Sequence, residues 1–285
     1  MTFPFPARRR VGFSLASAAM AIVVLAVAGE PTRAEPNKQV LEAAQRYKEE
    51  ALRLWERLVN IDSGTGDEQG LKEVAAIATE ELNKLGARLE TVSAKPAVGD
   101  NIVATFAGTG KGRIFLIAHM DTVFAKGVAA ARPFRIKDGR ALGPGVSDNK
   151  GGIISALYVL KILHGLNFRD YAQITLLLNT NEETGSLGTR LLIERLAKEH
   201  DVALNLEAGR PSDGLVVWRK GSGVIKVEVK GRAAHAGVAP DNGRNAAMEL
   251  AHQILQLGKL GDREMGTTVN FTVLNAGDRK NVIPD

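Results

Sequence analysis

The sequence feature that most constrains the fold is an alternation, in the middle of the chain, of short apolar runs with segments of helical periodicity. The run Ile114–Ala118 is apolar at every position, which is typical of a strand covered on both faces. Strand-like runs at Ile174–Leu178 and Val202–Leu206 alternate with helical patterns at Gly152–His164 and Thr189–Lys198. This alternation predicts an α/β fold with a mainly parallel sheet flanked by helices.

The flanking regions add further elements and a second domain. Upstream we expect two helices and two short strands, at Asn37–Asn60, Glu68–Leu85, Arg88–Val92 and Asn101–Phe106. Beyond residue 214 the sequence predicts three strands and one helix, at Leu215–Arg219, Val224–Val229, Thr267–Leu274 and Asn245–Leu257. We therefore expect a larger domain over residues 35–220 and a smaller α+β domain over residues 221–285.

The first 34 residues have the organisation of a bacterial signal peptide. Arg8-Arg9-Arg10 gives a positive start, Val11–Ala28 is uncharged and rich in Ala, Val and Leu, and Thr32-Arg33-Ala34 ends in a small residue. We expect cleavage after export, so that the mature protein is periplasmic or secreted and has no stable membrane association. The alternative is a retained membrane anchor, because the apolar run is at the lower length limit for a bilayer span.

Composition and charge narrow the chemistry and the partners. The chain has no cysteine, which excludes disulfides, thiolate metal sites and cysteine nucleophiles, so any metal must be held by His, Asp and Glu. Of the 37 basic and 32 acidic residues, four and one lie in the first 34 positions, so the rest has 33 and 31 and a net charge of +2. That balance gives no basic face for nucleic acid.

Several acidic residues and histidines stand directly after predicted strands or in Gly-rich turns. They are His119 and Asp121 after the first of the three apolar runs, Glu182 and Glu183 after the second, Glu207 after the third, and Asp148 and His235 in turns. Because the carboxyl ends of parallel strands face one crevice, we expect the residues that follow the strands to lie close together.

A cluster of this kind needs a cation, because neighbouring carboxylates push one another towards protonation. One imidazole with several carboxylates suits zinc, cobalt or manganese, and the surplus of oxygens favours two ions that share a bridging carboxylate. The residues alone leave other interpretations open. His119 with Asp121 is compatible with a capping pair, Glu182-Glu183 with a solvated loop, and His235 with a turn histidine.

Four motifs in a fixed order favour the metal interpretation. They are AHMDTV at 118–123, GPGVSDNKGG at 143–152, NEETGS at 181–186 and GRAAHAG at 231–237. Together they resemble the zinc metallopeptidase family of glutamate carboxypeptidases, aminoacylases and succinyl-diaminopimelate desuccinylases, over about Leu58 to Pro284. The resemblance implies a zinc-exopeptidase-like fold in which residues 35–220 are the catalytic domain and residues 221–285 a lid and dimerisation domain.

The resemblance also implies two Zn²⁺ ions per subunit and a role for each motif residue. The ligands of the two ions would be His119, Asp148, Glu183 and Glu207. Asp148 would bridge the two ions, and Asp121 would orient the imidazole of His119 from behind.

Three further residues receive roles in catalysis and binding from the same resemblance. Glu182 would be the general base, and if the Glu pair lies in an extended loop, neighbouring side chains point to opposite sides and can take different tasks. His235 would donate to the oxyanion in the site of the partner subunit, which implies a homodimer. Asn281 would contact the substrate.

The implied activity is hydrolysis of an amide bond in a small peptide or N-acyl amino acid, with release of a C-terminal amino acid, glutamate in folate-type or N-acyl-glutamate substrates. The alternatives are a related N-acyl-amino-acid or succinyl-diaminopimelate amidohydrolase, or a protein that binds metal or peptide without catalysis. Glu182 favours an enzyme, because a base that is not a ligand serves hydrolysis.

The chain ends at Asp285, inside the smaller domain of the family pattern. The family's last zinc-binding His and an Arg that holds the substrate carboxylate lie beyond that point. We therefore expect an incomplete lid domain and an inactive 285-residue chain from an active parent protein. The remaining histidines, His164, His200 and His252, have no acidic neighbours at ligand spacing, and we expect them to be structural.

Overall fold

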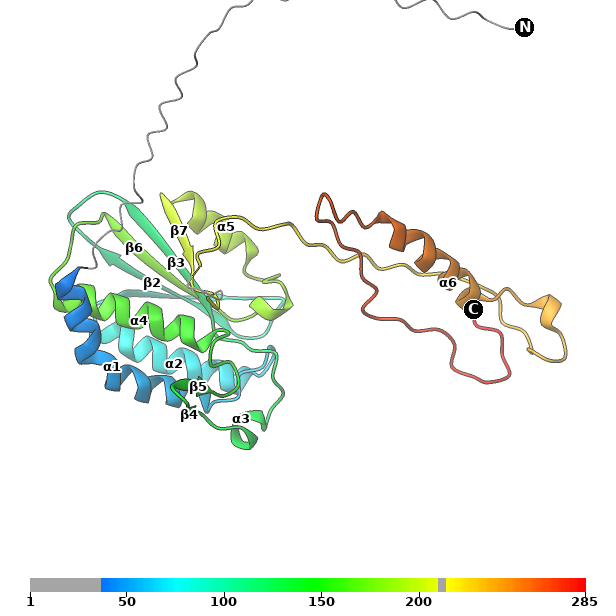
Figure 1. The fold of residues 1–285 in the computed structure, drawn as a ribbon, viewed down its shortest axis with the longest axis horizontal. Helices are drawn as coiled ribbons and strands as arrows, with labels where there is room; N and C mark the ends of the chain where they lie inside the picture. The colour runs from blue at the N-terminus through cyan, green and yellow to red at the C-terminus, as the bar shows by residue number, and fades with distance from the viewer. Residues whose placement is uncertain (1–36, 210–213) are drawn as a thin grey trace, which may run out of the picture. The chain divides into compact units, whose positions relative to one another are not determined.

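The computed structural model describes residues 37–209 and 214–285, which divide into two units between Gly214 and Leu215 (Figure 1). We call them the sheet unit and the C-terminal unit. The signal peptide expected over residues 1–34 lies outside the described residues. Within the described ranges, no helix has both the length and the apolar character that crossing a membrane requires.

The sheet unit is built on five strands. In spatial order they are β1 (Arg88–Ser93), β2 (Asp100–Ala107), β6 (Gln173–Asn179), β3 (Arg113–His119) and β7 (Val202–Asn205). Strand β3 pairs in parallel with β6 and β7, whereas β2 pairs antiparallel with β1 and β6. Every strand except β2 therefore runs in one direction, which confirms the predicted mainly parallel sheet.

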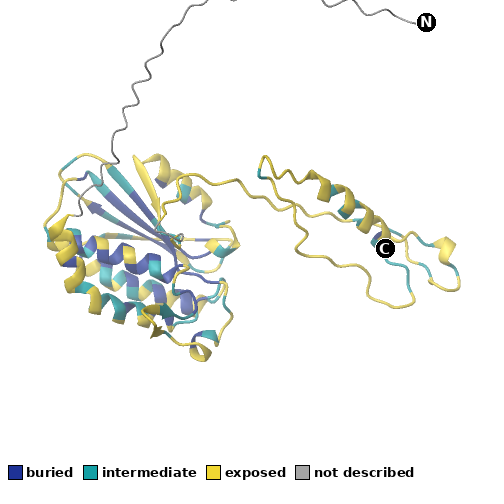
Figure 2. Cartoon of the chain, viewed as in Figure 1, coloured by how far each residue is buried: buried dark blue, intermediate teal, exposed yellow. Residues whose placement is uncertain are grey.

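Helices cover both faces of this sheet (Figure 1). Helices α1 (Lys38–Val59), α2 (Glu68–Lys84) and α4 (Lys150–Gly165) pack on one face, and α5 (Arg190–Lys198) packs on the other. Within β6, Leu176 and Leu178 belong to the first core and Leu177 to the second. The unbroken apolar run Ile114–Ala118 in the neighbouring strand β3 has the same cause, since side chains that alternate along a strand meet an apolar layer on either side. Figure 2 shows the resulting buried strands.

The predicted elements of the sheet unit agree with the observed bounds to within one or two residues. The structure adds a short helix and a two-stranded antiparallel hairpin between β3 and α4, formed by α3 (Val128–Ala131), β4 (Arg135–Lys137) and β5 (Arg140–Leu142). The first two helices begin at side-chain caps, because Asn37 accepts from the N–H of Val40 and Asp67 from that of Gly70.

The C-terminal unit contains α6 (Ala246–Leu257) and two 3₁₀ turns, η3 (Pro240–Asn242) and η4 (Gly258–Leu260). The helix confirms the predicted one. The strands predicted at Leu215–Arg219, Val224–Val229 and Thr267–Leu274 are wrong, because these segments form no ladder and the unit has only isolated bridges.

These three segments do not form strands because none of them lies beside a segment with which it pairs. Strands are stable when they pair and bury a face, but Leu215, Val217 and Val224 are each more than 90% exposed. Figure 2 shows the C-terminal unit as largely exposed. The smaller domain is therefore α-helix with irregular structure here, and not the α+β domain that its alternating pattern predicts.

Candidate metal centre

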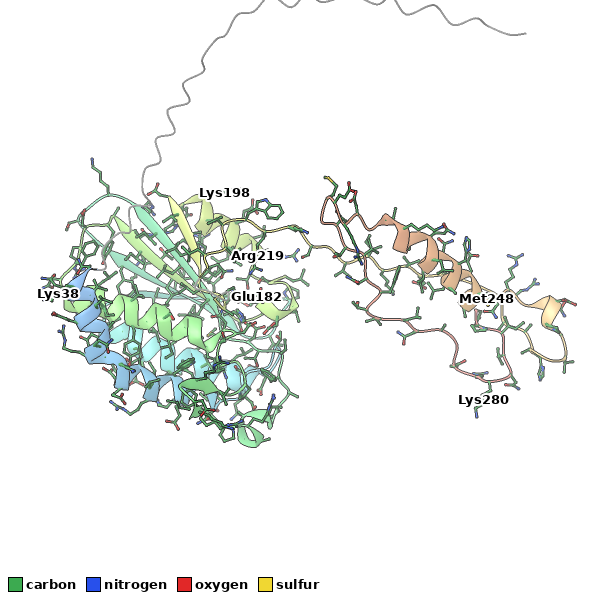
Figure 3. All side chains as sticks on the ribbon, in the orientation of Figure 1. Lys38, Glu182, Lys198, Arg219, Met248 and Lys280 are labelled. Atoms are coloured by element: carbon green, nitrogen blue, oxygen red, sulfur yellow. The ribbon has the colours of Figure 1, made fainter. Side chains whose placement is uncertain are left out.

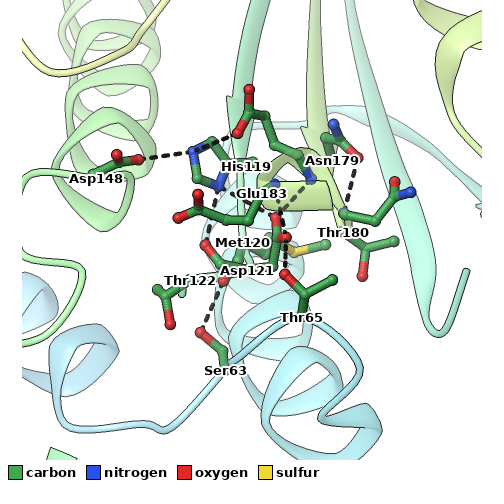
Figure 4. Close-up of polar contacts among 12 residues, drawn as sticks. Ser63, Thr65, His119, Met120, Asp121, Thr122, Asp148, Asn179, Thr180 and Glu183 are labelled. Carbon is green, nitrogen blue, oxygen red and sulfur yellow. Dashed lines mark hydrogen bonds and ion pairs between the residues drawn. The ribbon is translucent and has the colours of Figure 1, made fainter. Parts of the chain in front are cut away.

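The candidate site lies where β3, β6 and β7 end. His119 is the last residue of β3, and Glu182 and Glu183 form the turn η1 (Glu182–Thr184) three residues after β6. Glu207 follows β7 by two residues, and Asp148 stands just before α4. The apolar strands are fixed by the two cores, so the polar residues that follow them meet at one edge of the sheet. Figures 3 and 4 show side chains in this region.

Three of these residues form a compact donor set. Nε2 of His119 lies 2.9 Å from Oδ1 of Asp148 and 3.5 Å from Oε1 of Glu207. The candidate ligand atoms of the three residues all lie within 4.8 Å of one another. One imidazole nitrogen with carboxylate oxygens matches the preferences of a divalent ion such as Zn²⁺, so the residues present fit a metal.

The other nitrogen of the imidazole is already engaged. Nδ1 of His119 lies 3.0 Å from the backbone oxygen of Asp121 and 3.2 Å from its Oδ1 (Figure 4). Both side chains are almost completely buried. With Nδ1 held by Asp121, Nε2 is the nitrogen that faces the carboxylates and is free to bind a cation. Asp121 thus lies beside Nδ1, and its role as the residue that orients the imidazole stays a prediction.

The acids give the site a strongly negative potential. Burial alone would lower the pKa of His119, but its hydrogen bonds with Asp121 and Glu207 outweigh burial and raise this pKa to about 11. The same hydrogen bond from His119 lowers the pKa of Glu207. Burial raises the pKa of Glu182 and Glu183, and neighbouring carboxylates, Asp148 among them, raise both further. Such a potential favours any cation that enters.

The Glu pair differs from its expected geometry. It lies in a 3₁₀ turn and not in an extended loop, so the two side chains leave the backbone roughly 120° apart rather than on opposite sides. The side chain of Glu182 reaches to 3.9 Å from Nε2 of His119. Glu183 is not part of the three-residue donor set, and its role as a ligand stays a prediction.

His235 and Asn281 belong to the C-terminal unit. Nδ1 of His235 accepts hydrogen bonds from the N–H groups of Gly237 and Val238, at 3.2 and 3.1 Å. The backbone oxygen of Asn281 accepts from the N–H of Ala236 at 2.9 Å. The roles of His235 and Asn281 in catalysis and binding stay predictions.

The sequence patterns do not identify the loop of residues 61–65, which contacts the end of β3 and Asp121. Thr65 donates to Oδ2 of Asp121 at 2.6 Å, and Ser63 donates to the backbone oxygen of Met120 at 2.8 Å (Figure 4). The buried ammonium of Lys150 donates to the backbone oxygen of Ile61. The small polar run around Ser63 marks a turn in the sequence, but its contact with Asp121 spans 56 positions and no local pattern predicts it.

Comparisons with known proteins agree with this geometry. The model of peptidase family M20/M25/M40 matches residues 115–276. Carboxypeptidase G2 of Pseudomonas sp. (strain RS-16) is 38% identical over 260 residues, 90% of this chain and 63% of that protein. Acetylornithine deacetylase of Myxococcus xanthus is 31% identical over 199 residues, 65% of this chain and 50% of that protein. The crystal structure of aminopeptidase PepT from Bacillus cereus matches with a TM-score of 0.61 and 24% identity, over 84% of this chain and 64% of that one.

The chain spans less than two thirds of the length of each of these proteins. The likeness to PepT bears on the fold alone. The likeness to carboxypeptidase G2 confirms the family resemblance that the four motifs indicate. Within that family the sequence resembles glucarpidase, a carboxypeptidase G.

The donor set predicts which histidine the metal needs. Mutation of a residue that only hydrogen-bonds to a metal ligand weakens metal binding roughly 10- to 100-fold. We expect His119→Ala to weaken Zn²⁺ binding by more than this, because it removes a direct ligand. His164→Ala is the matched control, since His164 lies at the far end of α4 and outside the donor set. Zn²⁺ affinity measured by chelator competition checks this. Equal affinities of the two variants would contradict the assigned centre.

Proposed function

The chain belongs to peptidase family M20/M25/M40, and we propose that the protein is a zinc-dependent exopeptidase that hydrolyses an amide bond and releases a C-terminal amino acid. The observation that carries the proposal is the meeting of His119, Asp148 and Glu207 beside the half-exposed carboxylate of Glu182. A donor set alone serves binding, whereas a further acid that reaches the set without belonging to it serves proton transfer.

We propose two Zn²⁺ ions per subunit, held by His119, Asp148, Glu207 and Glu183, with Asp148 between them. When bound, such ions polarise a scissile carbonyl and lower the pKa of water to about 7. The chain's own residues set the orientation. Asp121 holds the imidazole of His119, so the metal-binding nitrogen needs little reorganisation when a cation arrives.

Glu182 is the proposed general base. Its backbone N–H donates to Oδ1 of Asp121 at 3.0 Å, which fixes the origin of its side chain. Its carboxylate remains half-exposed, so a water and a substrate can reach it. Burial and the neighbouring acids raise its pKa, which brings the carboxyl closer to the working pH and suits a group that first accepts a proton and then returns it to the leaving amine.

His235 is the proposed donor to the oxyanion, acting across a homodimer interface of residues 221–285. Its Nδ1 accepts two backbone N–H groups, so in the neutral ring the proton is on Nε2. That tautomer presents a donor, which is what an oxyanion requires. Asn281 lies in the chain segment whose backbone pairs with the residues next to His235, which supports a role at the same substrate.

The proposed substrates are folate-type or other N-acyl-glutamates, and the proposed location is the periplasm or the exterior of a bacterium. The resemblance to glutamate carboxypeptidases supports the former, and the Arg8-Arg9-Arg10 start with its apolar run supports the latter. The second candidate is an amidohydrolase of other N-acyl amino acids. Its support is the 31% identity to acetylornithine deacetylase over 65% of the chain.

The first prediction here concerns the substrate. We expect kcat/KM for N-(4-aminobenzoyl)-glutamate to exceed that for N-acetylornithine and N-succinyl-diaminopimelate by at least about 10-fold, because a site that pairs a buried carboxylate rejects substrates without it. N-(4-aminobenzoyl)-2-aminobutyrate is the control that lacks only the side-chain carboxylate. The assay measures kcat/KM of all four compounds on one preparation of the protein. Preference for either other acyl amino acid would favour the second candidate.

A second prediction separates the roles of the Glu pair. Glu182→Gln should keep the bound zinc while kcat falls about 10²- to 10⁴-fold, because only proton acceptance is lost. Glu183→Gln should lose zinc first. Elemental analysis beside the turnover assay distinguishes the two variants, and zinc loss in Glu182→Gln with retention in Glu183→Gln would reverse the assignments.

A third prediction tests whether His235 acts across subunits. We expect Glu182→Gln and His235→Ala homodimers to be nearly inactive and their mixture, after subunit exchange, to recover about a quarter of the wild-type activity. Half of the mixed dimers are heterodimers, and one of their two sites has both residues. Recovery is measured as turnover against mixing time. A mixture that exchanges subunits yet stays inactive would place His235 in its own subunit's site.

A further inference from the structure

The carboxylate of Asp121 is the point where three segments of the metal centre join. Oδ1 lies 3.2 Å from Nδ1 of His119 and accepts from the N–H of Glu182 at 3.0 Å. Oδ2 accepts from the N–H of Glu183 at 3.2 Å and from the hydroxyl of Thr65 at 2.6 Å. An ionised carboxylate offers about four acceptor sites, so this buried group is fully used.

We propose that Thr65 is a positioning residue of the metal centre, whose hydroxyl fixes the carboxylate of Asp121 and thereby both the imidazole of His119 and the Glu182-Glu183 turn. Three of the four donors belong to the groups that Asp121 has to hold. Among the described contacts, the hydroxyl of Thr65 is the donor to this carboxylate that comes from outside the cluster. A hydroxyl that donates to an ionised carboxylate at this length makes a strong, directional bond.

Thr65 can serve as an anchor because its own backbone is fixed. Its N–H donates to the backbone oxygen of Thr122 at 3.1 Å, and the N–H of Thr122 donates to the backbone oxygen of Ser63 at 2.9 Å. Gly64 lies between them in a parallel bridge to Thr122, and a Cβ there would lie 2.3 Å from the backbone oxygen of Phe124. This close approach requires glycine and brings the loop against the end of β3.

The loop of residues 61–65 is also fixed at its N-terminal end, where the buried ammonium of Lys150 donates a hydrogen bond to the backbone oxygen of Ile61. Lys150 opens α4, directly after Asp148 and Asn149. A threonine is stiff about χ1 because it is branched at Cβ, so its hydroxyl holds one direction once the backbone is set. Removal of the hydroxyl takes from Oδ2 the shortest of its hydrogen bonds, so the carboxylate of Asp121 is held less firmly.

The test measures Zn²⁺ affinity of the 285-residue chain by chelator competition, so it does not depend on turnover. We expect Thr65→Val, which keeps the shape and removes the hydroxyl, to weaken binding about 10- to 100-fold, as loss of an outer contact does. Thr65→Ser restores the hydroxyl and should bind within about threefold of the wild type. Ser63→Ala is the matched control, because it removes a bond of similar length from the same loop without touching Asp121.

A double-mutant cycle shows whether Thr65 acts through Asp121. We expect Thr65→Val to add no further loss of zinc affinity in an Asp121→Ala background. Unchanged affinity in Thr65→Val, equal losses in Thr65→Val and Ser63→Ala, or an additive loss in the double variant would each overturn the role of Thr65. If Thr65→Val does not fold, Thr65→Ser and Thr65→Ala supply the same comparison.

The inference rests on the proposed metal centre, and the two can fail separately. If the wild-type chain binds no zinc, both the proposed metal centre and the proposed role of Thr65 are wrong. If the wild-type chain binds zinc and Thr65→Val binds it equally well, only the proposed role of Thr65 is wrong. The substrate preference of the protein affects neither outcome.

Discussion

The structure of this site depends on one electrostatic constraint, which is that acids gathered around a buried imidazole need a positive charge among them. Without one, each carboxylate disfavours ionisation of the next. The strength of this need is visible at His119, where hydrogen bonds with Asp121 and Glu207 favour a proton on the imidazole and raise its pKa to about 11 against the opposing effect of burial. A divalent ion that took the place of that proton would satisfy more of the acids at once, which is why the donor set suits a metal better than an ion pair.

The fold satisfies this constraint by its strand order. Strand β3 lies between β6 and β7 and runs parallel to both, so the residues after all three strands emerge at the same edge. The two apolar cores fix the strands from both faces and leave the site residues little freedom to separate. Burial of apolar side chains thus holds charged groups together that would repel one another in solution.

The sequence predicted those parts of the structure that depend on local pattern. The run that forms β3 is continuously apolar because both faces are covered, and His119, Glu182 and Glu207 became candidates because they follow predicted strands. Pairing is not local. The segment Val224–Val229 alternates as a strand does but finds no partner in the described residues, and Thr65 meets Asp121 across 56 positions. A hydrophobic pattern indicates which secondary structure a segment can adopt, but it does not indicate which other segment will pack or pair with it.

The Glu pair lies in a turn that leaves both side chains available for the different roles proposed for them. Both N–H groups of Glu182 and Glu183 point to the one carboxylate of Asp121, so the turn is fixed by its backbone and neither side chain is needed to hold it. The side chains are then free for chemistry, and the 3₁₀ geometry sends them in directions roughly 120° apart. The side chain of Glu182 reaches to 3.9 Å from Nε2 of His119, whereas Glu183 makes no such approach among the described contacts. The proposed division of roles, with Glu182 as base and Glu183 as ligand, is compatible with this backbone geometry, because the turn does not depend on either side chain.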